Sequence, residues 1–147
     1  MADIVDEQTR SRMMSGIRGR DTKIELRVRK SLHALGFRYR LGGRNLPGRP
    51  DIVLSKHKAL VFVHGCFWHG HDCSLFRHPK TRAGFWLQKI HANRERDRRN
   101  IAELERNGWR PFVVWECSLR GVPAQQVAQL LIRLADAIQT ARNAEWQ

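Results

Sequence analysis

The chain has 147 residues and carries 27 lysine and arginine residues against 14 acidic ones, which gives a formal net charge of +13 at pH 7. A hydrophobic content of 41% is that of a soluble globular protein, and the length allows one domain with a substantial core. Such a charge argues against an ordinary metabolic enzyme. It favours a polyanion, above all nucleic acid, because arginine binds phosphate through paired hydrogen bonds. A solvated basic surface, an acidic membrane or an acidic protein partner are the alternatives.

The sequence shows no sign of a membrane-spanning or secreted protein. No apolar run approaches the roughly 20 residues of a membrane span, and the N-terminus lacks the apolar core of a signal peptide. We therefore expect a cytoplasmic protein whose three cysteines are reduced. Their odd number and uneven spacing favour a metal site or core positions over disulfides.

The first elements in chain order are an arm and a helix. Residues 1–20 are polar and basic without an apolar face, which predicts an arm that grips a ligand. A helix is expected from Thr22 to Leu35, because Thr22 and Glu25 form a capping box and the apolar residues fall on one stripe. Gly36 ends this helix. Residues 37–41 then alternate like a strand, and a stiff loop rich in proline and glycine leads to Asp51.

The centre of the chain predicts a hairpin. The apolar runs 52–54 and 59–63 have the length and β-branched content of buried strands, and a short polar link joins them. Asp51 precedes the first strand, and a segment rich in histidine, cysteine and aromatic residues follows the second. Both therefore lie at the same end of the hairpin, where loops on a rigid scaffold can form a functional site.

The remaining elements complete an α/β domain. We expect a helix from Phe85 to Asn107, a strand from Trp109 to Trp115 and a last helix that begins at Pro123. This order predicts three layers, with helices flanking a mixed sheet. Residues 21–147 are thus expected to form a single domain after the arm.

Four possible metal ligands stand out. Cys66, His71 and Cys73 lie within eight residues, and Cys117 follows the end of another predicted strand. Four ligands of nitrogen and sulfur suit a closed, tetrahedral and therefore structural zinc site. Three inert core thiols beside a surface histidine are the alternative.

Three carboxylates are candidates for chemistry. Asp51 could bind Mg²⁺, or could simply form the turn after Pro50. The capping box explains Glu25 without any chemistry. Asp97 lies on the apolar stripe of its helix, where an ionised acid is costly unless it is paired. We expect it to form either a salt bridge with an arginine or a hydrogen bond to an active-site histidine.

Two histidines flank the proposed zinc ligands. His64 or His69 could act as a general base or contact a phosphate, because imidazole titrates near neutral pH. The alternative is that one or both are spare metal ligands.

Two pairs of adjacent aromatic residues stand out. Phe67 and Trp68 occupy a loop tip, where a core pair is not expected, and apolar wedges flanked by arginine suit insertion between bases. Phe85 and Trp86 begin a helix beside Arg82. For Phe85 we expect ordinary core packing.

These motifs together resemble the very-short-patch repair endonucleases, the Vsr family, which nick DNA beside T:G mismatches left by deamination of 5-methylcytosine. The resemblance spans residues 9 to about 120. The motifs that carry it are LPGRPD at 46–51, VHGCFWH at 63–69, TR at 81–82, FW at 85–86, NRERDRR at 93–99 and VWEC at 114–117.

The resemblance implies a restriction-endonuclease-like fold and an Mg²⁺-dependent enzyme that cuts one strand next to the mismatched T to start very-short-patch repair. Asp51 would be the Mg²⁺ ligand, and Val63 could contribute only its backbone carbonyl. The other expected active-site residues are His69 as base or proton shuttle, His64 as support for the scissile phosphate, Glu25 as holder of metal waters and Asp97 as the residue that orients a histidine.

The resemblance also implies a structural zinc bound by the four ligands Cys66, His71, Cys73 and Cys117. Gly70 and Asp72 stand where the family is richer in histidine, so Asp72 is a rival zinc ligand. Residues 1–20 would lie in the minor groove. The expected DNA contacts are the wedge Phe67, Trp68 and Trp86, together with Met14 and Arg82.

The expected partner is double-stranded DNA with a T:G mismatch, bound by a monomer on the chromosome of a bacterial cell. Mismatch-repair proteins and a repair polymerase are candidate partners. Two rival functions are a zinc-stabilised DNA-binding module without catalysis and a restriction-type nuclease that cuts matched duplex.

Overall fold

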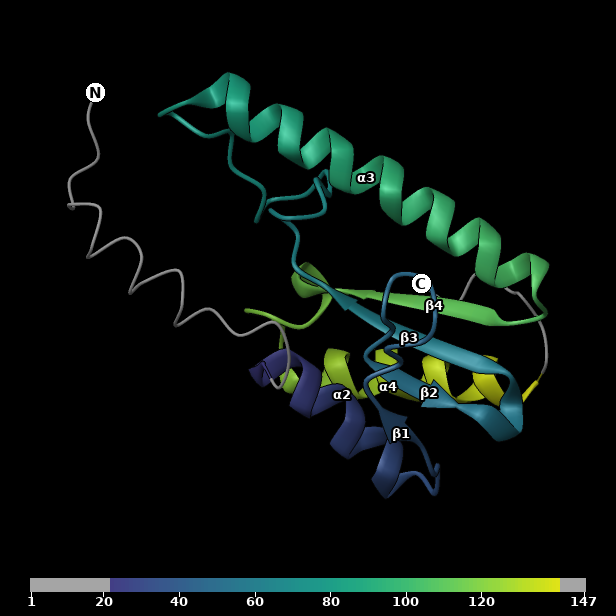
Figure 1. Cartoon of the computed structure of the whole chain (residues 1–147). Helices are drawn as coiled ribbons and strands as arrows, with labels where there is room; N and C mark the ends of the chain where they lie inside the picture. The colour runs from purple at the N-terminus through teal and green to yellow at the C-terminus, as the bar shows by residue number, and fades with distance from the viewer. Residues whose placement is uncertain (1–21, 141–147) are drawn as a thin grey trace.

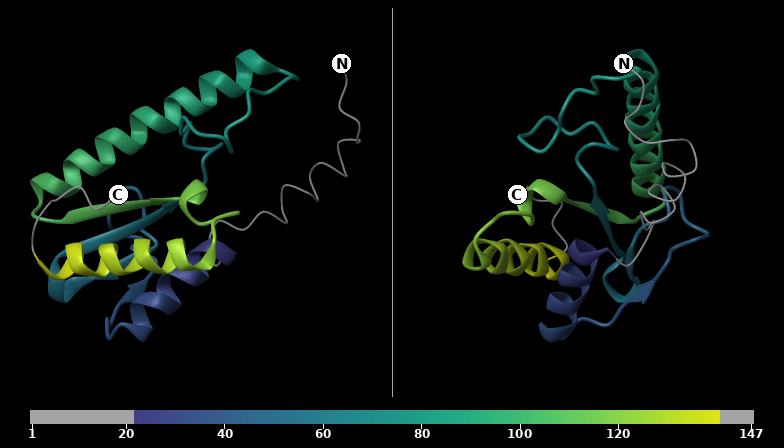
Figure 2. Two further views of the ribbon diagram at one scale, coloured as in Figure 1. Left: turned by 180° about the vertical axis from the view of Figure 1, so that it is seen from behind. Right: turned by 90° about the vertical axis from the view of Figure 1, so that its left-hand side faces the viewer.

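The computed structural model describes residues 22–140, in which a four-stranded sheet lies between helices (Figure 1). Helix α3 (Ala83–Arg106) crosses one face, and α2 (Lys23–Ala34) and α4 (Ala124–Gln139) cover the other, as the views in Figure 2 also show. The strands lie in the order β1 (Arg40–Leu41), β2 (Ile52–Leu54), β3 (Ala59–His64) and β4 (Arg110–Trp115). The predicted mixed α/β architecture is thus confirmed for these residues. The predicted arm, with Met14, lies outside them.

The strand directions are mixed. Strands β1, β2 and β3 pair antiparallel, and β4 pairs parallel with β3. The antiparallel hairpin of β2 and β3 is the predicted one, closed by a short 3₁₀ turn, η1 (Ser55–His57). The parallel pair needs a crossover, which α3 provides between β3 and β4.

Two apolar cores hold the layers together, because successive side chains of a strand point to opposite faces. The smaller core lies beneath α3 and contains Val53, Leu60, Phe62 and Leu104. The larger core lies between the sheet and the helices α2 and α4, and its fully buried members include Val28, Leu32, Ile52, Leu54, Val61, Val114, Leu134 and Ile138.

Helix α2 begins as predicted. The Thr22 side chain accepts a hydrogen bond from the Glu25 N–H at 3.3 Å, and Glu25 Oε2 accepts one from the Thr22 N–H at 3.3 Å. Leu35 departs from the prediction, since it lies past the last helical residue and is 46% exposed. None of the helices in residues 22–140 combines the length and the apolar character that a membrane crossing needs.

The predicted strand 37–41 is shorter in the structure. Only Arg40 and Leu41 pair with β2, as an edge strand. Phe37 is buried in the larger core instead, and Tyr39 donates its hydroxyl hydrogen bond to the Arg29 carbonyl of α2 at 3.0 Å. The alternating pattern of this segment therefore reflects packing against α2 as much as strand pairing.

The sheet register brings distant segments to one edge. His64 and Trp115 are partners in the parallel pair, so the chain leaves β3 and β4 side by side, and Cys66 and Cys117 follow on these exits. Asp51 precedes β2, whose first residue pairs with Val61 of the antiparallel β3. Asp51 therefore lies at that same edge.

Candidate active site and metal centre

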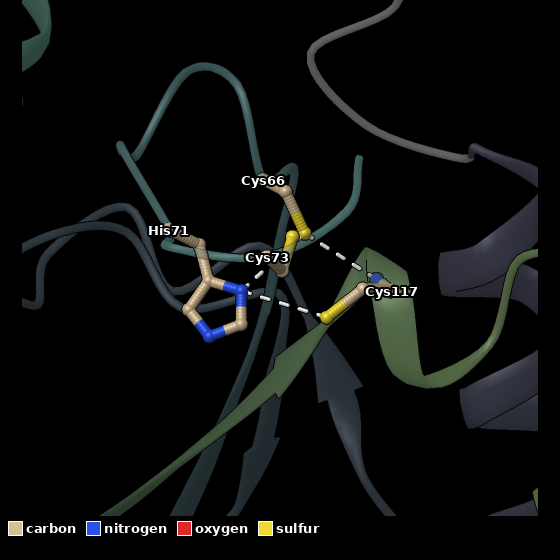
Figure 3. A group of neighbouring side chains, drawn as sticks. All are labelled: Cys66, His71, Cys73 and Cys117. Carbon is tan, nitrogen blue, oxygen red and sulfur yellow. Dashed lines mark hydrogen bonds between the residues drawn. The ribbon is translucent and has the colours of Figure 1, made fainter. Parts of the chain in front are cut away.

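Four side chains converge just beyond the ends of β3 and β4 (Figure 3). The Sγ atoms of Cys66, Cys73 and Cys117 and a ring nitrogen of His71 all lie within 4.8 Å of one another. His71 Nδ1 is 3.7 Å from the sulfur of Cys66 and 3.5 Å from that of Cys117. Asp72, the predicted rival ligand, is exposed and is not part of this cluster.

These distances fit a metal ion with tetrahedral coordination. With Zn–S near 2.3 Å and Zn–N near 2.0–2.1 Å, two ligands at a tetrahedral angle lie about 3.5–3.8 Å apart. Burial raises the pKa of the Cys66 thiol to about 12, although the hydrogen bond from the backbone N–H of Cys117 lowers it. A cation bound among the three thiols would favour their thiolate forms. The donor set therefore fits a closed zinc site.

Neighbouring groups fix the cluster in place. The His71 ring stacks on Trp115, with centroids 4.1 Å apart and planes 8° apart, which sets the direction of its nitrogens. Glu116 Oε1 accepts the N–H of Cys66 at 3.3 Å, and the N–H of Cys117 points to the Cys66 sulfur at 3.3 Å. The rings of Trp115 and His64 also meet in a T-shaped contact, with centroids 5.2 Å apart, so one indole lies against a histidine of the metal cluster and a histidine of the neighbouring site.

A cavity of about 500 Å³ lies beside this cluster, on the side of the sheet that α3 covers. Its wall comes from the loop before β2, the end of β3, the loop after it and the middle of α3. The lining residues are Gly48, Arg49, Asp51, Phe62, Val63, His64, His69, Arg96, Asp97 and Asn100. The predicted residues Asp51, Val63, His64, His69 and Asp97 thus meet in one place.

Asp51 is held in the wall by the backbone. Its Oδ2 accepts a hydrogen bond from the Val63 N–H at 2.7 Å, and its own N–H donates to the Val61 carbonyl at 3.0 Å. Burial raises the pKa of Asp51 to about 7, the Val63 N–H lowers it, and the neighbouring Glu25 carboxylate raises it. Glu25 is itself only 4% exposed. The half-buried carboxylate of Asp51 and the buried one of Glu25 together make a strong site for a hard cation.

Glu25 therefore has two partners. It closes the capping box of α2, as the sequence predicted, and its carboxylate also lies beside that of Asp51. The first arrangement requires nothing beyond helix formation. The contact with Asp51 brings α2 to the edge of the sheet where the cavity opens. The capping role of Glu25 therefore does not exclude a role in the site.

His69 pairs with Asp97. The Nδ1 atom of His69 lies 2.5 Å from Asp97 Oδ2, which decides between the two predicted partners of this acid in favour of the histidine. A carboxylate can only accept, so the pair assigns the proton to Nδ1 and leaves Nε2 of a neutral ring as an acceptor. His69 is thereby prepared to take up a proton.

His64 lies against His69 in a parallel stack. The ring centroids are 3.7 Å apart and the planes 4° apart. Burial lowers the pKa of His64 to about 4, with a further lowering from His69 and a raising by Asp97, so His64 is neutral at pH 7. Its buried Nδ1 has no hydrogen-bond partner among the described residues.

The stack bears on the prediction that these histidines are spare metal ligands. A ring nitrogen directs its lone pair in the plane of the ring. Two parallel rings stacked face to face therefore direct their lone pairs side by side rather than at one point. Although their nitrogens and an Asp97 oxygen lie within 4.8 Å of one another, this geometry does not suit chelation of a single ion.

The three aromatic residues of the predicted wedge form a half-exposed group outside both cores. Phe67, Trp68 and Trp86 meet edge to face, with centroids 5.3 to 6.1 Å apart. The expectation that Phe67 and Trp68 avoid the core is confirmed. The expectation of core packing for Phe85 is wrong, because it is 46% exposed and lies beneath the Arg82 guanidinium, 4.3 Å from the ring centre. This placement leaves the first turn of α3 largely in solvent.

One face of α3 positions the loop that carries Trp68 and His69. Asn93 donates to the Trp68 carbonyl at 2.9 Å, and Asp97, one turn later, holds His69. Gly70 has φ +61°, and a Cβ there would lie 2.6 Å from Ile90 Cγ2. A residue with a side chain would push the loop away from α3, which explains why glycine suits this position.

Sequence reasoning missed several residues of the site. Arg49, Arg96 and Asn100 line the cavity, and Asn93 anchors its loop. By the helical period alone Arg96 falls opposite the apolar stripe of α3, yet it lines the cavity. The polar residues Asn93, Arg96, Asp97 and Asn100 follow one another at spacings of three, one and three residues. This polar stripe beside the apolar one was the signal that could have found them.

Comparisons with known proteins agree with the site. A family model described as DNA mismatch endonuclease Vsr matches residues 2–75. The DNA mismatch endonuclease Vsr of Escherichia coli K12 is 47% identical over 146 residues, which cover 99% of this chain and 88% of that protein. The chain therefore belongs to the Vsr family, as predicted, and is a DNA endonuclease.

Two further relatives support this membership. The type II nicking enzyme V.NmeAIP of Neisseria meningitidis is 45% identical, over 94% of this chain and 100% of its own. The type II nicking enzyme V.XorIIP of Xanthomonas oryzae is also 45% identical, over 84% of this chain and 91% of its own.

Proposed function

We propose that this endonuclease nicks one strand of duplex DNA next to the T of a T:G mismatch, using Mg²⁺, and so starts very-short-patch repair. The observation that carries the proposal is the cavity in which Asp51, His64 and His69 meet at the open edge of the sheet. A restriction-endonuclease-like fold, expected from the family, agrees with the mixed sheet that presents an acidic residue at the start of β2. The enzyme would act as a monomer on chromosomal DNA.

The residues around Asp51 fit Mg²⁺. The Asp51 carboxylate and the Val63 backbone carbonyl would hold the ion, and Glu25 adds a second carboxylate nearby. These are hard oxygen donors of the kind that Mg²⁺ requires, and burial together with the neighbouring Glu25 carboxylate raises the pKa of Asp51, an effect that a bound cation would offset. When bound, Mg²⁺ would stabilise the negative charge that develops on the phosphate and the leaving oxygen.

His69 would act as the base. A water molecule attacks the phosphorus atom, and Nε2 of His69 takes its proton while Nδ1 stays bonded to Asp97. Asp97 would hold the ring in this tautomer and stabilise the imidazolium that forms. His64, buried and neutral, would donate a hydrogen bond to a phosphate oxygen. The P–O3′ bond breaks, the leaving O3′ takes a proton from solvent water, and the products are a 3′-hydroxyl and a 5′-phosphate.

The aromatic group beside the cavity would recognise the mismatch. Phe67, Trp68 and Trp86 are apolar, half exposed and flanked by Arg82, which suits insertion between base pairs. Unstacking costs a few kcal/mol, and less for a wobble pair than for a normal pair, so insertion itself discriminates. Asn93 and the zinc cluster would keep the wedge in position.

Zinc at Cys66, His71, Cys73 and Cys117 would be structural. A closed site with four protein ligands leaves no position for a substrate. It would tie the loop after β3 to the end of β4 and so hold His69 and Trp68 at the mouth of the cavity. The arm 1–20 and Met14 remain predicted minor-groove contacts.

The test is nicking of labelled duplexes that differ only in one pair, T:G, T:A or C:G, with Mg²⁺ and with EDTA. We expect a single cut beside the mismatched T, with Mg²⁺ only. Tight binding without cutting would favour the non-catalytic DNA-binding module. Equal cutting of the matched duplexes would favour a restriction-type nuclease. Varied flanking bases would then reveal the sequence context.

A further inference from the structure

Two arginines at the mouth of the cavity pair with no carboxylate among residues 22–140. Arg49 comes from the loop before β2 and Arg96 from α3, and both are exposed at the rim. Within residues 22–140 the Arg49 guanidinium makes no hydrogen bond or ion pair. Arg96 donates only to Asn93 Oδ1, at 3.1 Å, and pairs with no carboxylate of that part of the chain. Both guanidinium groups therefore retain donors for a ligand.

The backbone at Arg49 is strained. Arg49 has φ +50°, a left-handed conformation that is uncommon for a residue with a side chain. It lies between Gly48, with φ +76°, and Pro50. Strained residues of this kind persist where the surrounding structure fixes them, commonly at functional sites. Here the strain occurs two residues before the proposed metal ligand Asp51.

The two arginines approach the cavity from neighbouring elements. A Cβ at Gly48 would lie 3.1 Å from Phe62 Cε1 and 3.3 Å from Asn100 Cβ, so this loop lies directly against both β3 and α3. Asn100 is one helical turn beyond Arg96. The loop that carries Arg49 thus packs one turn away from Arg96, and both side chains line the cavity that contains Asp51 and His69.

We propose that Arg49 and Arg96 form a clamp for the phosphodiester that occupies this cavity. Guanidinium groups present paired donors that match two phosphate oxygens. In phosphoryl transfer the negative charge spreads over the non-bridging oxygens, where fixed cations stabilise the transition state. The clamp rests on the proposed function for the identity of the phosphate. It adds two phosphate-binding residues to Asp51, His64 and His69.

The variants are chosen to leave the fold intact. Arg49→Asn removes the charge and retains a residue that tolerates the left-handed conformation. Arg96→Gln removes the charge and retains an N–H donor for Asn93. Arg98→Gln is the matched control, because Arg98 lies on the same helix, is exposed, pairs with Glu95 at 3.1 Å and does not line the cavity. Each single change lowers the net charge equally.

The first measurement is single-turnover nicking of a T:G duplex at saturating full-length enzyme in Mg²⁺. The clamp predicts that Arg49→Asn and Arg96→Gln each slow the chemical step by about a hundredfold, the size of effect seen when one preorganised donor is lost. Arg98→Gln should stay within about threefold of wild type, because an exposed charge contributes mainly to general attraction. Clamp variants as fast as Arg98→Gln would overturn the proposal.

The second measurement locates the contact and does not depend on cleavage. Affinity is measured in EDTA for T:G duplexes that carry one neutral methylphosphonate, placed in turn at each phosphate near the mismatched T. At one position the wild type and Arg98→Gln should lose about tenfold in affinity, and the Arg49→Asn/Arg96→Gln double variant should lose almost nothing. An equal penalty in all three proteins at every position would overturn the clamp. Wild type that binds but fails to nick would instead count against the proposed function, and the binding comparison would still decide on the clamp.

Discussion

The Nδ1 atom of His69 lies 2.5 Å from the Oδ2 atom of Asp97, which joins the loop after β3 to the middle of α3. This contact explains why an acid is tolerated on the inward face of a helix. It also determines which histidine nitrogen is available to a substrate. On the proposed mechanism, the proton-accepting power of His69 depends on a residue that need not touch DNA.

Asp97→Asn should therefore slow nicking while leaving DNA binding nearly unchanged. An amide can donate to Nδ1 and so allows the tautomer in which Nε2 carries the proton and cannot act as a base. We expect single-turnover rates to fall by about a hundredfold or more. Asp136→Asn, an exposed change on α4, is the control. A rate equal to that of the control would mean that Asp97 has only a structural role.

The metal centre predicts one zinc per chain and its loss in Cys117→Ala. Because Cys117 connects η2 (Glu116–Ser118) to the loop after β3, we expect the free energy of unfolding to fall by several kcal/mol. Elemental analysis and urea unfolding measure the two effects, and Ser118→Ala is the neighbouring control. Native protein that contains no zinc would contradict the metal centre and favour inert core cysteines.

Trp68→Ala tests the wedge. The residue is half exposed and outside both cores, so its removal should hardly change the melting temperature. Affinity for a T:G duplex should fall much more than affinity for the matching T:A duplex, because only the first gains from easy unstacking. Trp109→Ala is a useful contrast, since Trp109 packs against the smaller core and should lower stability without changing the T:G preference. Equal losses of affinity on both duplexes would exclude a wedge.

Much of the fold could be predicted because the signals are local. The capping box of Thr22 and Glu25, the polar link of the hairpin and the apolar stripes of the helices all lie within short windows. The proximity of Cys66 and Cys117 could also be predicted, because each residue follows the end of a predicted strand. What the sequence could not provide is the register that makes His64 and Trp115 neighbours, because pairing between distant strands depends on the whole sheet.

The sequence pattern misplaces Arg96 and Phe85 for the same reason, because local periodicity does not show which elements pack against a helix. The helical period alone placed Arg96 outward, whereas the loop before β2 closes over that side of α3 and turns it into the wall of a cavity. Phe85 was expected in the core, but it is exposed because α3 extends beyond the sheet at that end (Figure 1). Arg110 has a structural role in the basic chain. It donates hydrogen bonds to the carbonyls of His57, Ala137 and Ile138 and so ties the end of α4 to the hairpin.

The central claim is that Asp51 organises the chemistry of a mismatch-specific nicking site. The most direct measurement compares wild type and Asp51→Asn for both binding and single-turnover nicking of one T:G duplex across a range of Mg²⁺ concentrations. An amide is a poor ligand for a hard cation, so we predict that binding stays within a few fold and that nicking is lost at every Mg²⁺ concentration. Nicking by Asp51→Asn at near wild-type rates in Mg²⁺ would contradict the account, because the cavity would then not be the place where the strand is cut.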